Sequence, residues 1–250
     1  MTLITYDHYR AGQAEYPVLL RRLISERKPG SICDVGGGAA PALTIDEVDE
    51  LGVEYTLLDI SSGELSKAPD EYLKVQMDIS APGVGGEIEM RFDLIQSRML
   101  AEHINDAELF HRNVFDLLKP GGTAIHMMPT LWDPAFILNR ILPDRLTGLL
   151  IAKLQPKRRL TGDQGKFPAY YRWCRGPSTA HIRRFENLGY EVVAAKGYFG
   201  TDYAEKLPLI GKALDTLTRR LLSHPVSSLT SYCILILRKP TGALSPLPFE

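Results

Sequence analysis

Glycines and acidic residues recur in this chain directly after short apolar segments. Gly36, Gly37 and Gly38 follow SICDV, Asp59 ends VEYTLLDI, and Asp78 ends YLKVQMDI. Short apolar runs bounded in this way are typical of buried β-strands. Because ligands of an open parallel sheet bind beyond the carboxyl ends of its strands, we expect these residues to share one ligand-binding edge.

The residue types at this edge suit a nucleoside. Glycine lets the backbone turn sharply and approach a ligand where a Cβ would collide, and the amides of a following helix point at the ligand. The carboxylate of Asp59 could accept hydrogen bonds from two vicinal ribose hydroxyls, and that of Asp78 from an exocyclic amine or amide. A nucleoside could therefore be recognised from ribose to base.

The glycine stretch CDVGGGAAP does not identify the ligand by itself. It departs from the dinucleotide pattern G-x-G-x-x-G, since Pro41 stands three residues after Gly38. It also lacks the lysine and the serine or threonine of a P-loop. Taken alone, the stretch is as consistent with a structural turn as with a binding loop.

Strand and helix patterns alternate through the first 130 residues, with five strands among them. This alternation predicts a single α/β domain, with a mostly parallel sheet and helices on both faces. A helical cap is expected at about 1–29 and a helical lid insertion at about 130–176. Two further strands are expected at 190–200 and 231–239, and the second should be antiparallel because residues 201–228 offer no standard crossover helix.

Several motifs together resemble a known family. The acid and spaced glycines of E/D-x-G-x-G-x-G are matched by Asp34, Gly36 and Gly38, with Ala40 in place of the third glycine. The stretches FDLIQSRMLAEHI and LLKPGG match the family's later motifs, and the similarity covers Ile32–Met127. With Asp59 and Asp78, these residues resemble a class I S-adenosylmethionine-dependent methyltransferase of the small-molecule methyltransferase 11 type.

The resemblance implies a Rossmann-like sheet of seven strands, S-adenosylmethionine as cofactor and S-adenosylhomocysteine as product. It implies a set of cofactor-binding residues: Asp34, Gly36, Gly37 and Gly38 at the methionine end, Asp59 and Ile60 at the ribose, Asp78 and Ile79 at the adenine, and Ser97 through its backbone. S-adenosylmethionine has no phosphates, so the site needs no pyrophosphate-binding geometry.

His103 is the first candidate for a catalytic base, since histidine titrates near neutrality and a hydroxyl acceptor must lose its proton. The alternative is that His103 packs or hydrogen-bonds locally. We expect His126 to face the core. His181 and His8 are weaker candidates for contact with the pocket.

An aromatic and cationic group, Tyr170, Tyr171, Arg172 and Trp173, is predicted to bind the acceptor. Such side chains suit sugar rings, phosphates or carboxylates. The alternative is packing of a lid with solvated arginines. As a group they favour an anionic or glycosylated acceptor.

The charge balance gives no bias toward nucleic acid, because 29 Lys and Arg stand against 30 Asp and Glu. The segment Leu131–Arg184 nevertheless carries a net charge of +8. Its stretch from Phe136 to Leu154, followed by Lys157–Arg159, could rest on an anionic membrane surface. We favour a buried lid, since lid helices are commoner.

Neither a secretory signal nor a membrane span is expected, and the three cysteines look like core thiols of a cytoplasmic protein. We also predict no metal, since the acids near His103 stand at a helix start, where they stabilise the helix dipole.

The leading hypothesis is methyl transfer to a hydroxyl of a small molecule, a sugar or a lipid-linked glycan. The alternatives are an N-methyltransferase, an NAD-dependent oxidoreductase and a non-catalytic nucleoside-binding protein. The oligomeric state is left open.

Overall fold

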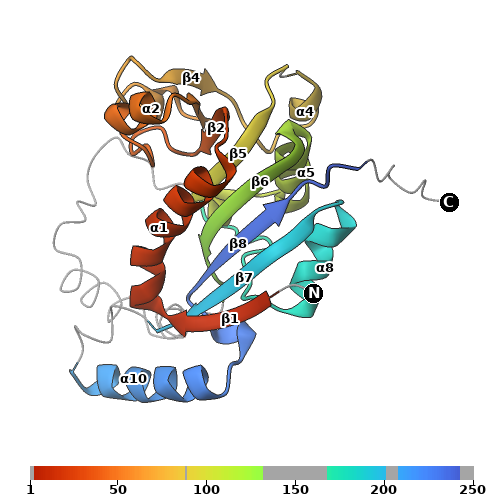
Figure 1. Cartoon of the computed structure of the whole chain (residues 1–250). Helices are drawn as coiled ribbons and strands as arrows, with labels where there is room; N and C mark the ends of the chain where they lie inside the picture. Colours follow the sequence, from red (N-terminus) through yellow and green to blue (C-terminus); the bar gives the residue numbers. More distant parts are fainter. Residues whose placement is uncertain (1–2, 88, 132–167, 201–207, 243–250) are drawn as a thin grey trace.

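The computed structural model describes residues 3–87, 89–131, 168–200 and 208–242 (Figure 1). Eight strands in this part of the chain form one sheet, in the order β1-β7-β8-β6-β5-β2-β3-β4. The strands are β1 (Leu3–His8), β2 (Ser31–Val35), β3 (Glu54–Asp59), β4 (Leu73–Gln76), β5 (Phe92–Arg98), β6 (Leu118–Pro129), β7 (Glu191–Phe199) and β8 (Tyr232–Arg238). The described helices are α1 (Tyr9–Arg27), α2 (Ile45–Leu51), α3 (Ser62–Leu65), α4 (Val84–Glu87), α5 (Ala107–Leu117), α8 (Thr179–Asn187) and α10 (Pro208–Ser223), with short 3₁₀ helices η1 (Ala101–His103) and η2 (Ser227–Leu229).

The direction of the strands confirms the predicted mixed sheet. β8 lies between β6 and β7 and runs antiparallel to both, whereas the other neighbouring strands pair in parallel. The carboxyl ends of β2, β3, β4 and β5 therefore meet at one edge, as the sequence predicted. This edge positions the site.

One strand was not predicted. Residues 3–8, assigned to a helical cap, form β1 and pair in parallel with β7, from Leu3 opposite Ala194 to His8 opposite Phe199. The short strand LITYDH pairs with β7, which lies far along the chain. The residues near LITYDH in the sequence therefore do not show that it is a strand. The rest of the predicted cap is the helix α1.

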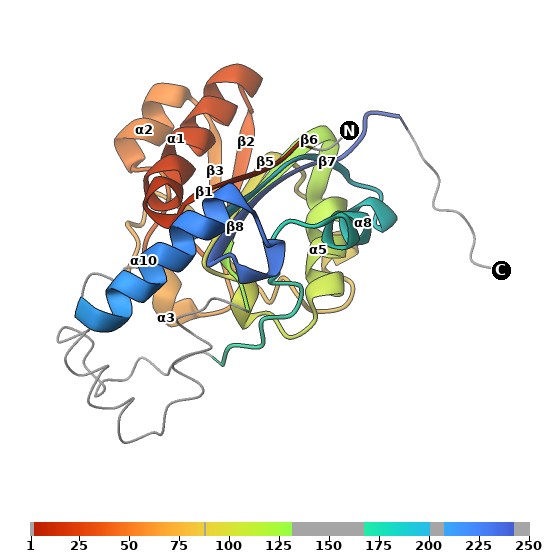
Figure 2. The same cartoon turned by 90° about the horizontal axis from the view of Figure 1, so that it is seen from below.

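Helices cover both faces of the sheet, as expected. Figure 2 shows α1, α2 and α10 on one side and α5 and α8 on the other. On the first face the core includes Tyr16 and Leu20 of α1, and on the second it includes Phe110 and Val114 of α5. A Cβ at Gly12 would lie 2.9 Å from the Tyr198 ring, so a glycine is needed for α1 to lie this close to β7.

The predicted KPGG turn lies within β6. Phe92 pairs with Leu118 and then Leu94 pairs with Thr123, so the intervening residues form an irregularity in the strand. Gly121 there has φ +82°, which glycine adopts without strain. The turn residues therefore change the register of the strand instead of separating it from α5.

The predicted lid falls largely outside the described residues. Residues 132–167, which include the amphipathic and basic stretch considered for membrane contact, are not described. Residues 168–176 are described and lie beside η1, as shown below.

Candidate cofactor and acceptor site

The glycine loop after β2 is closely packed at all three positions. Gly36 has φ +79°, and a Cβ there would lie 3.0 Å from the Leu100 side chain. A Cβ at Gly37 would collide with the carboxylate of Asp34. One at Gly38 would lie 2.9 Å from Asp59 Oδ2. Larger residues at these positions would displace the loop, so it is a built structure and not a flexible turn.

Asp34 lies beneath this loop and is 1% exposed. Its carboxylate accepts hydrogen bonds from Tyr55 Oη at 2.6 Å, from the Ala42 amide at 2.9 Å, and from the Gln96 side-chain amide. Burial raises the pKa of Asp34 to about 6, although these three donors act in the opposite direction. Asp34 therefore holds the far end of the loop in place, and its oxygens are occupied by protein donors.

Asp59 ends β3 and joins the loop to the next strand. Its Oδ2 accepts from the Gly38 amide at 3.3 Å and its Oδ1 from the Ser61 amide at 2.9 Å. The carboxylate is only partly buried, so it retains capacity to accept further bonds. Ile60 follows with 54% of its surface exposed. The structure thus brings the predicted Asp59 and Ile60 to the edge of the glycine loop.

Asp78 and Ile79, two residues beyond β4, differ in their surroundings. Asp78 is exposed, and its Oδ1 accepts from the Ser80 amide at 2.9 Å and from the Ser80 hydroxyl at 2.7 Å. The Ile79 side chain is buried in the core on the α5 face, and its carbonyl accepts from the Asn113 side chain at 2.8 Å. The side chain and the carbonyl of Ile79 are therefore both used within the protein.

Ser97, near the carboxyl end of β5, is 1% exposed. Its hydroxyl lies 2.7 Å from His126 Nδ1. Its carbonyl accepts from the Tyr16 hydroxyl at 3.1 Å. Neither group of Ser97 is directed at open space, so its predicted backbone contact is already used within the protein.

A cavity of ≈ 470 Å³ lies between the glycine loop, α1 and the end of β5. Its lining comprises Tyr16, Pro17, Leu20, Arg21, Asp34, Gly36, Gly37, Ala40, Pro41, Ala42, Gln96, Arg98 and Met99. Three of the predicted site residues, Asp34, Gly36 and Gly37, are among them. Arg98 and Met99 stand at the carboxyl end of a strand, as Asp59 does, so the same sequence pattern could have located them. Nothing in the sequence around Tyr16 indicated that it would line the cavity.

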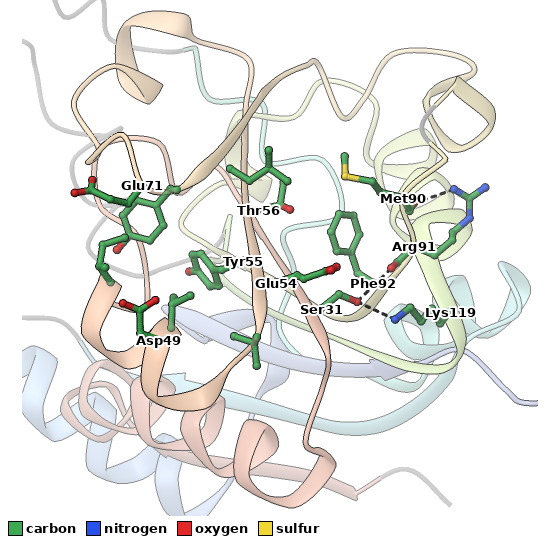
Figure 3. Close-up of a pocket in the computed structure, with 15 residues that line it drawn as sticks. Ser31, Asp49, Glu54, Tyr55, Thr56, Glu71, Met90, Arg91, Phe92 and Lys119 are labelled. Atoms are coloured by element: carbon green, nitrogen blue, oxygen red, sulfur yellow. Dashed lines mark hydrogen bonds between the residues drawn. The ribbon is translucent and has the colours of Figure 1, made fainter.

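A larger cavity, of ≈ 730 Å³, lies at the opposite edge of the sheet (Figure 3). Ser31, Glu54 and Phe92, which line it, are the first residues of β2, β3 and β5. Lys119 on one side lies 3.0 Å from the Ser31 hydroxyl and 2.8 Å from Asp93 Oδ2. This is the amino edge of the strands, away from the glycine loop, and none of the predicted site residues lines it.

His103 lies in η1, just beyond β5, with 34% of its side chain exposed. Its Nδ1 is 3.0 Å from the carbonyl oxygen of Pro168, and its Nε2 is 3.8 Å from Glu102 Oε1. The Glu102 side chain is buried, and burial raises the pKa of its carboxyl group. The local hydrogen bond that we considered as an alternative role for His103 is therefore present, yet the ring remains partly accessible.

The predicted acceptor-binding group lies next to η1. The amides of Tyr170 and Tyr171 donate to the Glu102 carbonyl at 2.7 and 3.1 Å. Tyr170 and Arg172 are exposed. Trp173 instead packs inward, stacked on His111 with ring centroids 5.9 Å apart. The structure therefore brings Tyr170 and Tyr171 beside η1, whereas the partly buried Trp173 packs against the core.

The other histidines are not placed at the cavity. His126 is fully buried, as predicted. His181 packs on Phe185, with ring centroids 5.1 Å apart, and does not line the cavity. His8 caps the start of α1, where its side chain accepts from the Arg10 amide.

The three cysteines, Cys33, Cys174 and Cys233, are free and buried, as predicted. Among the described residues, no group of histidine, cysteine and acidic side chains could hold a metal ion. Within the same part of the chain, no helix is both long and apolar enough to cross a membrane.

Comparison with known proteins identifies a family for this chain. The family profile described as a methyltransferase domain, Methyltransf_23, matches residues 6–195. Among solved structures, an S-adenosylmethionine-dependent methyltransferase of Archaeoglobus fulgidus superposes with a TM-score of 0.54 at 14% identity, covering 93% of this chain and all of that one. Phosphoethanolamine N-methyltransferase 2 of Haemonchus contortus superposes with a TM-score of 0.53 at 14% identity, covering 91% of this chain and 52% of that one. At this identity the two structures establish a shared fold.

Among curated proteins, malonyl-[acyl-carrier protein] O-methyltransferase of Pseudescherichia vulneris is 29% identical over 121 residues. That alignment covers 47% of this chain and 46% of the enzyme, so the matched region spans less than half of either protein. The family match, in contrast, covers most of the chain and includes the glycine loop, Asp59 and η1. The chain therefore belongs to the methyltransferase-domain family and shares its fold with the S-adenosylmethionine-dependent methyltransferase of Archaeoglobus fulgidus.

Proposed function

We propose that this protein transfers a methyl group from S-adenosylmethionine to a hydroxyl of a small molecule, a sugar or a lipid-linked glycan, with His103 as the base. The observation that carries the proposal is the arrangement at the carboxyl edge of the sheet. There the glycine loop borders a cavity of ≈ 470 Å³, and η1 with His103 begins two residues after the cavity-lining Met99.

The residues at this edge fit the cofactor. A Cβ at any loop glycine would meet a neighbouring side chain, so the glycines allow close packing of the loop, and Gly36 and Gly37 line the cavity. No lysine stands in the loop to meet a phosphate, in keeping with a ligand that has none. Asp59, partly exposed beside Gly38, would accept the ribose hydroxyls, and the exposed Ile60 would contact the ribose side.

The remaining assignments follow from the same geometry. Asp78 would accept from the adenine amine, and the backbone of Ile79 would approach the ring. Asp34 and Ser97 would not contact the cofactor directly, because protein donors already occupy their oxygens. Asp34 would instead hold the glycine loop in position, and Ser97 would hold α1. When bound, S-adenosylmethionine supplies an electrophilic methyl group, so the protein has to orient the acceptor and take up its proton.

The acceptor would approach from the side of residues 168–173. Tyr170 and Arg172 are exposed there, in the segment beside η1. An aromatic face and a guanidinium favour an acceptor with a sugar ring or an anionic group. The three buried thiols are consistent with a reducing compartment, and we place the reaction in the cytoplasm.

The proposal is tested with isotope-labelled S-adenosylmethionine that carries a deuterated methyl group. The protein is incubated with extract of its source cells, and labelled products are identified by mass spectrometry. We expect a labelled methyl ether of a small or glycosylated molecule, absent when His103→Ala replaces the wild type. A product labelled on nitrogen would overturn the hydroxyl assignment, and a product formed equally by His103→Ala would overturn the role of the base.

A further inference from the structure

Glu102 is a buried carboxyl group whose burial serves no evident structural purpose. Its side chain is 6% exposed, and in the described part of the chain its Oε2 has no hydrogen-bond partner. A buried acceptor without a donor costs about 1–3 kcal/mol, and more when it is charged. Asp34, the comparable buried acid, has three donors and a clear role in the loop.

The Glu102 carboxyl group lies beside the ring of its neighbour in the sequence, His103. Glu102 Oε1 lies 3.8 Å from His103 Nε2, while Nδ1 of the same ring lies 3.0 Å from the Pro168 carbonyl oxygen. A carbonyl oxygen only accepts, so the hydrogen bond at Nδ1 requires a proton there. The neutral ring then presents the lone pair of Nε2 on the side of Glu102.

A ring that gains a second proton meets acceptors on both sides. Its Nδ1 proton faces Pro168 and its Nε2 proton faces the carboxylate of Glu102. The arrangement is therefore complementary to the charged form of the ring, which is the form that a general base reaches after proton transfer. The carboxylate of a serine hydrolase also stabilises a charged histidine, but it faces the other ring nitrogen, whereas Glu102 faces the nitrogen that takes up the proton.

The backbone holds the two side chains as one unit. The Glu102 carbonyl accepts from the amides of Tyr170 and Tyr171, and the same segment supplies the Pro168 carbonyl. Burial raises the pKa of the Glu102 carboxyl group, whereas the charge of His103 lowers it. The side chains are thus coupled electrostatically as well as by position.

We propose that Glu102 is the positioning residue of His103, whose carboxylate orients the ring and balances the charge that the ring gains from the acceptor. The inference rests on the proposed function, in which His103 is the base. In the step concerned, the O–H bond of the acceptor breaks and its proton passes to Nε2. The electron pair stays on the oxygen and would form the new bond to the methyl carbon, while the bond between that carbon and the sulfonium sulfur would break and leave its electron pair on the sulfur.

The pairing is tested first without any acceptor or cofactor. The carboxyl carbon of Glu102 is followed by NMR as a function of pH in the wild type and in His103→Gln. Loss of the imidazole charge should raise the midpoint for Glu102 by about one pH unit. His224→Gln, which changes an exposed histidine, should leave it unchanged. Equal midpoints in the wild type and in His103→Gln would overturn the proposal.

The consequence for the reaction is tested with Glu102→Gln, which keeps the shape of the side chain and removes its charge. Turnover should fall by about 10- to 100-fold, with unchanged affinity for S-adenosylhomocysteine. Glu102→Asp should retain more activity than Glu102→Gln, and the matched surface variant Glu108→Gln should behave as the wild type. Wild-type turnover of Glu102→Gln would overturn the proposal. If the wild type transfers no methyl group but the NMR coupling is present, the proposed function fails while the pairing stands.

Discussion

The hydroxyl of Tyr16 lies 2.6 Å from Oε1 of Gln96 and so ties α1 to the carboxyl edge of the sheet. The amide of the same Gln96 side chain donates to Asp34, which in turn accepts from the Ala42 amide beyond the glycines. Three side chains therefore connect the helix to the glycine loop. Because Tyr16, Asp34 and Gln96 all line the cavity, this connection sets the distance between its walls.

Tyr16→Phe tests the connection. Loss of the hydroxyl leaves the buried acceptors of Gln96 and Ser97 without their donor, which should lower the free energy of unfolding by about 1–3 kcal/mol. It should also weaken the binding of S-adenosylhomocysteine, since α1 is no longer fixed to the loop. Urea denaturation and calorimetry measure the two effects.

Tyr190→Phe is the matched control, because its buried hydroxyl donates to the His111 carbonyl at 2.8 Å on the other face of the sheet. It should lose stability without losing affinity for the ligand. Equal affinities in the two variants would argue against a role of the Tyr16 connection in the cavity.

Gly38→Ala tests the packing of the loop. The added Cβ would lie 2.9 Å from Asp59 Oδ2 and from the Cβ of Glu64, so the loop or Asp59 has to move. Overpacking of this kind costs about 1–3 kcal/mol, and binding of S-adenosylhomocysteine should weaken by about tenfold or more. Gly86→Ala, where a Cβ meets nothing within 4 Å, should bind normally. Normal binding by Gly38→Ala would show that the cofactor does not use this loop.

His103→Ala tests the base. Removal of a general base typically lowers turnover by about 10²- to 10⁴-fold, and we expect at least the lower figure with little change in affinity for S-adenosylhomocysteine. Steady-state kinetics and calorimetry separate the two effects. The exposed His224, changed to alanine, serves as the control. Unaltered turnover in His103→Ala would remove His103 from the mechanism.

The buried histidines predict a loss of stability in acid. Burial lowers the pKa of His126 and of His181 from 6.5 to about 4. The unfolded chain therefore binds protons on these residues below about pH 6.5, whereas the folded protein binds them only near pH 4. Stability from these groups is present above pH 6.5 and is lost as the pH falls toward 4.

Asp34 acts in the opposite direction, since its raised pKa of about 6 lets the folded protein bind a proton before the unfolded chain does. The contribution of one histidine is isolated with His126→Asn, which does not titrate. Its unfolding free energy should change less steeply between pH 6.5 and 4 than that of the wild type, by up to about 1.4 kcal/mol per pH unit. Parallel curves for the two proteins would contradict the account, and the exposed variant His224→Asn provides the reference.

Much of the fold was predictable because the chain marks its strands locally. β2, β3 and β5 are short apolar runs that end at glycine or polar residues, and β8 is a continuous apolar strand. The expectation that no standard helix stands between the last two strands was wrong, since α10 precedes β8, yet β8 is antiparallel to its neighbours as predicted. β1 was missed because it is a short strand whose pairing with β7 is not visible in the local sequence. LLKPGG was expected to form a turn before a strand, yet Leu118 already pairs with Phe92, and the residues up to Thr123 form an irregularity within β6.

The site was predictable to the extent that its residues follow strands. Asp59 and the three glycines could be located from spacing, since the carboxyl ends of parallel strands meet at one edge. Tyr16 and Gln96 could not, because their role comes from a contact between elements that are 80 residues apart. Trp173 was predicted to bind the acceptor because it is an aromatic residue among others of that kind. Its stacking on His111 depends on tertiary packing, which the local sequence does not show.

The most direct test of the central claim is calorimetric titration of the wild-type protein with S-adenosylhomocysteine and, separately, with NAD. The glycine loop, which departs from the dinucleotide pattern G-x-G-x-x-G at Pro41, together with Asp59 predicts saturable binding of S-adenosylhomocysteine at one site and no detectable binding of NAD. Binding of NAD in the absence of any affinity for S-adenosylhomocysteine would contradict the assignment of this site.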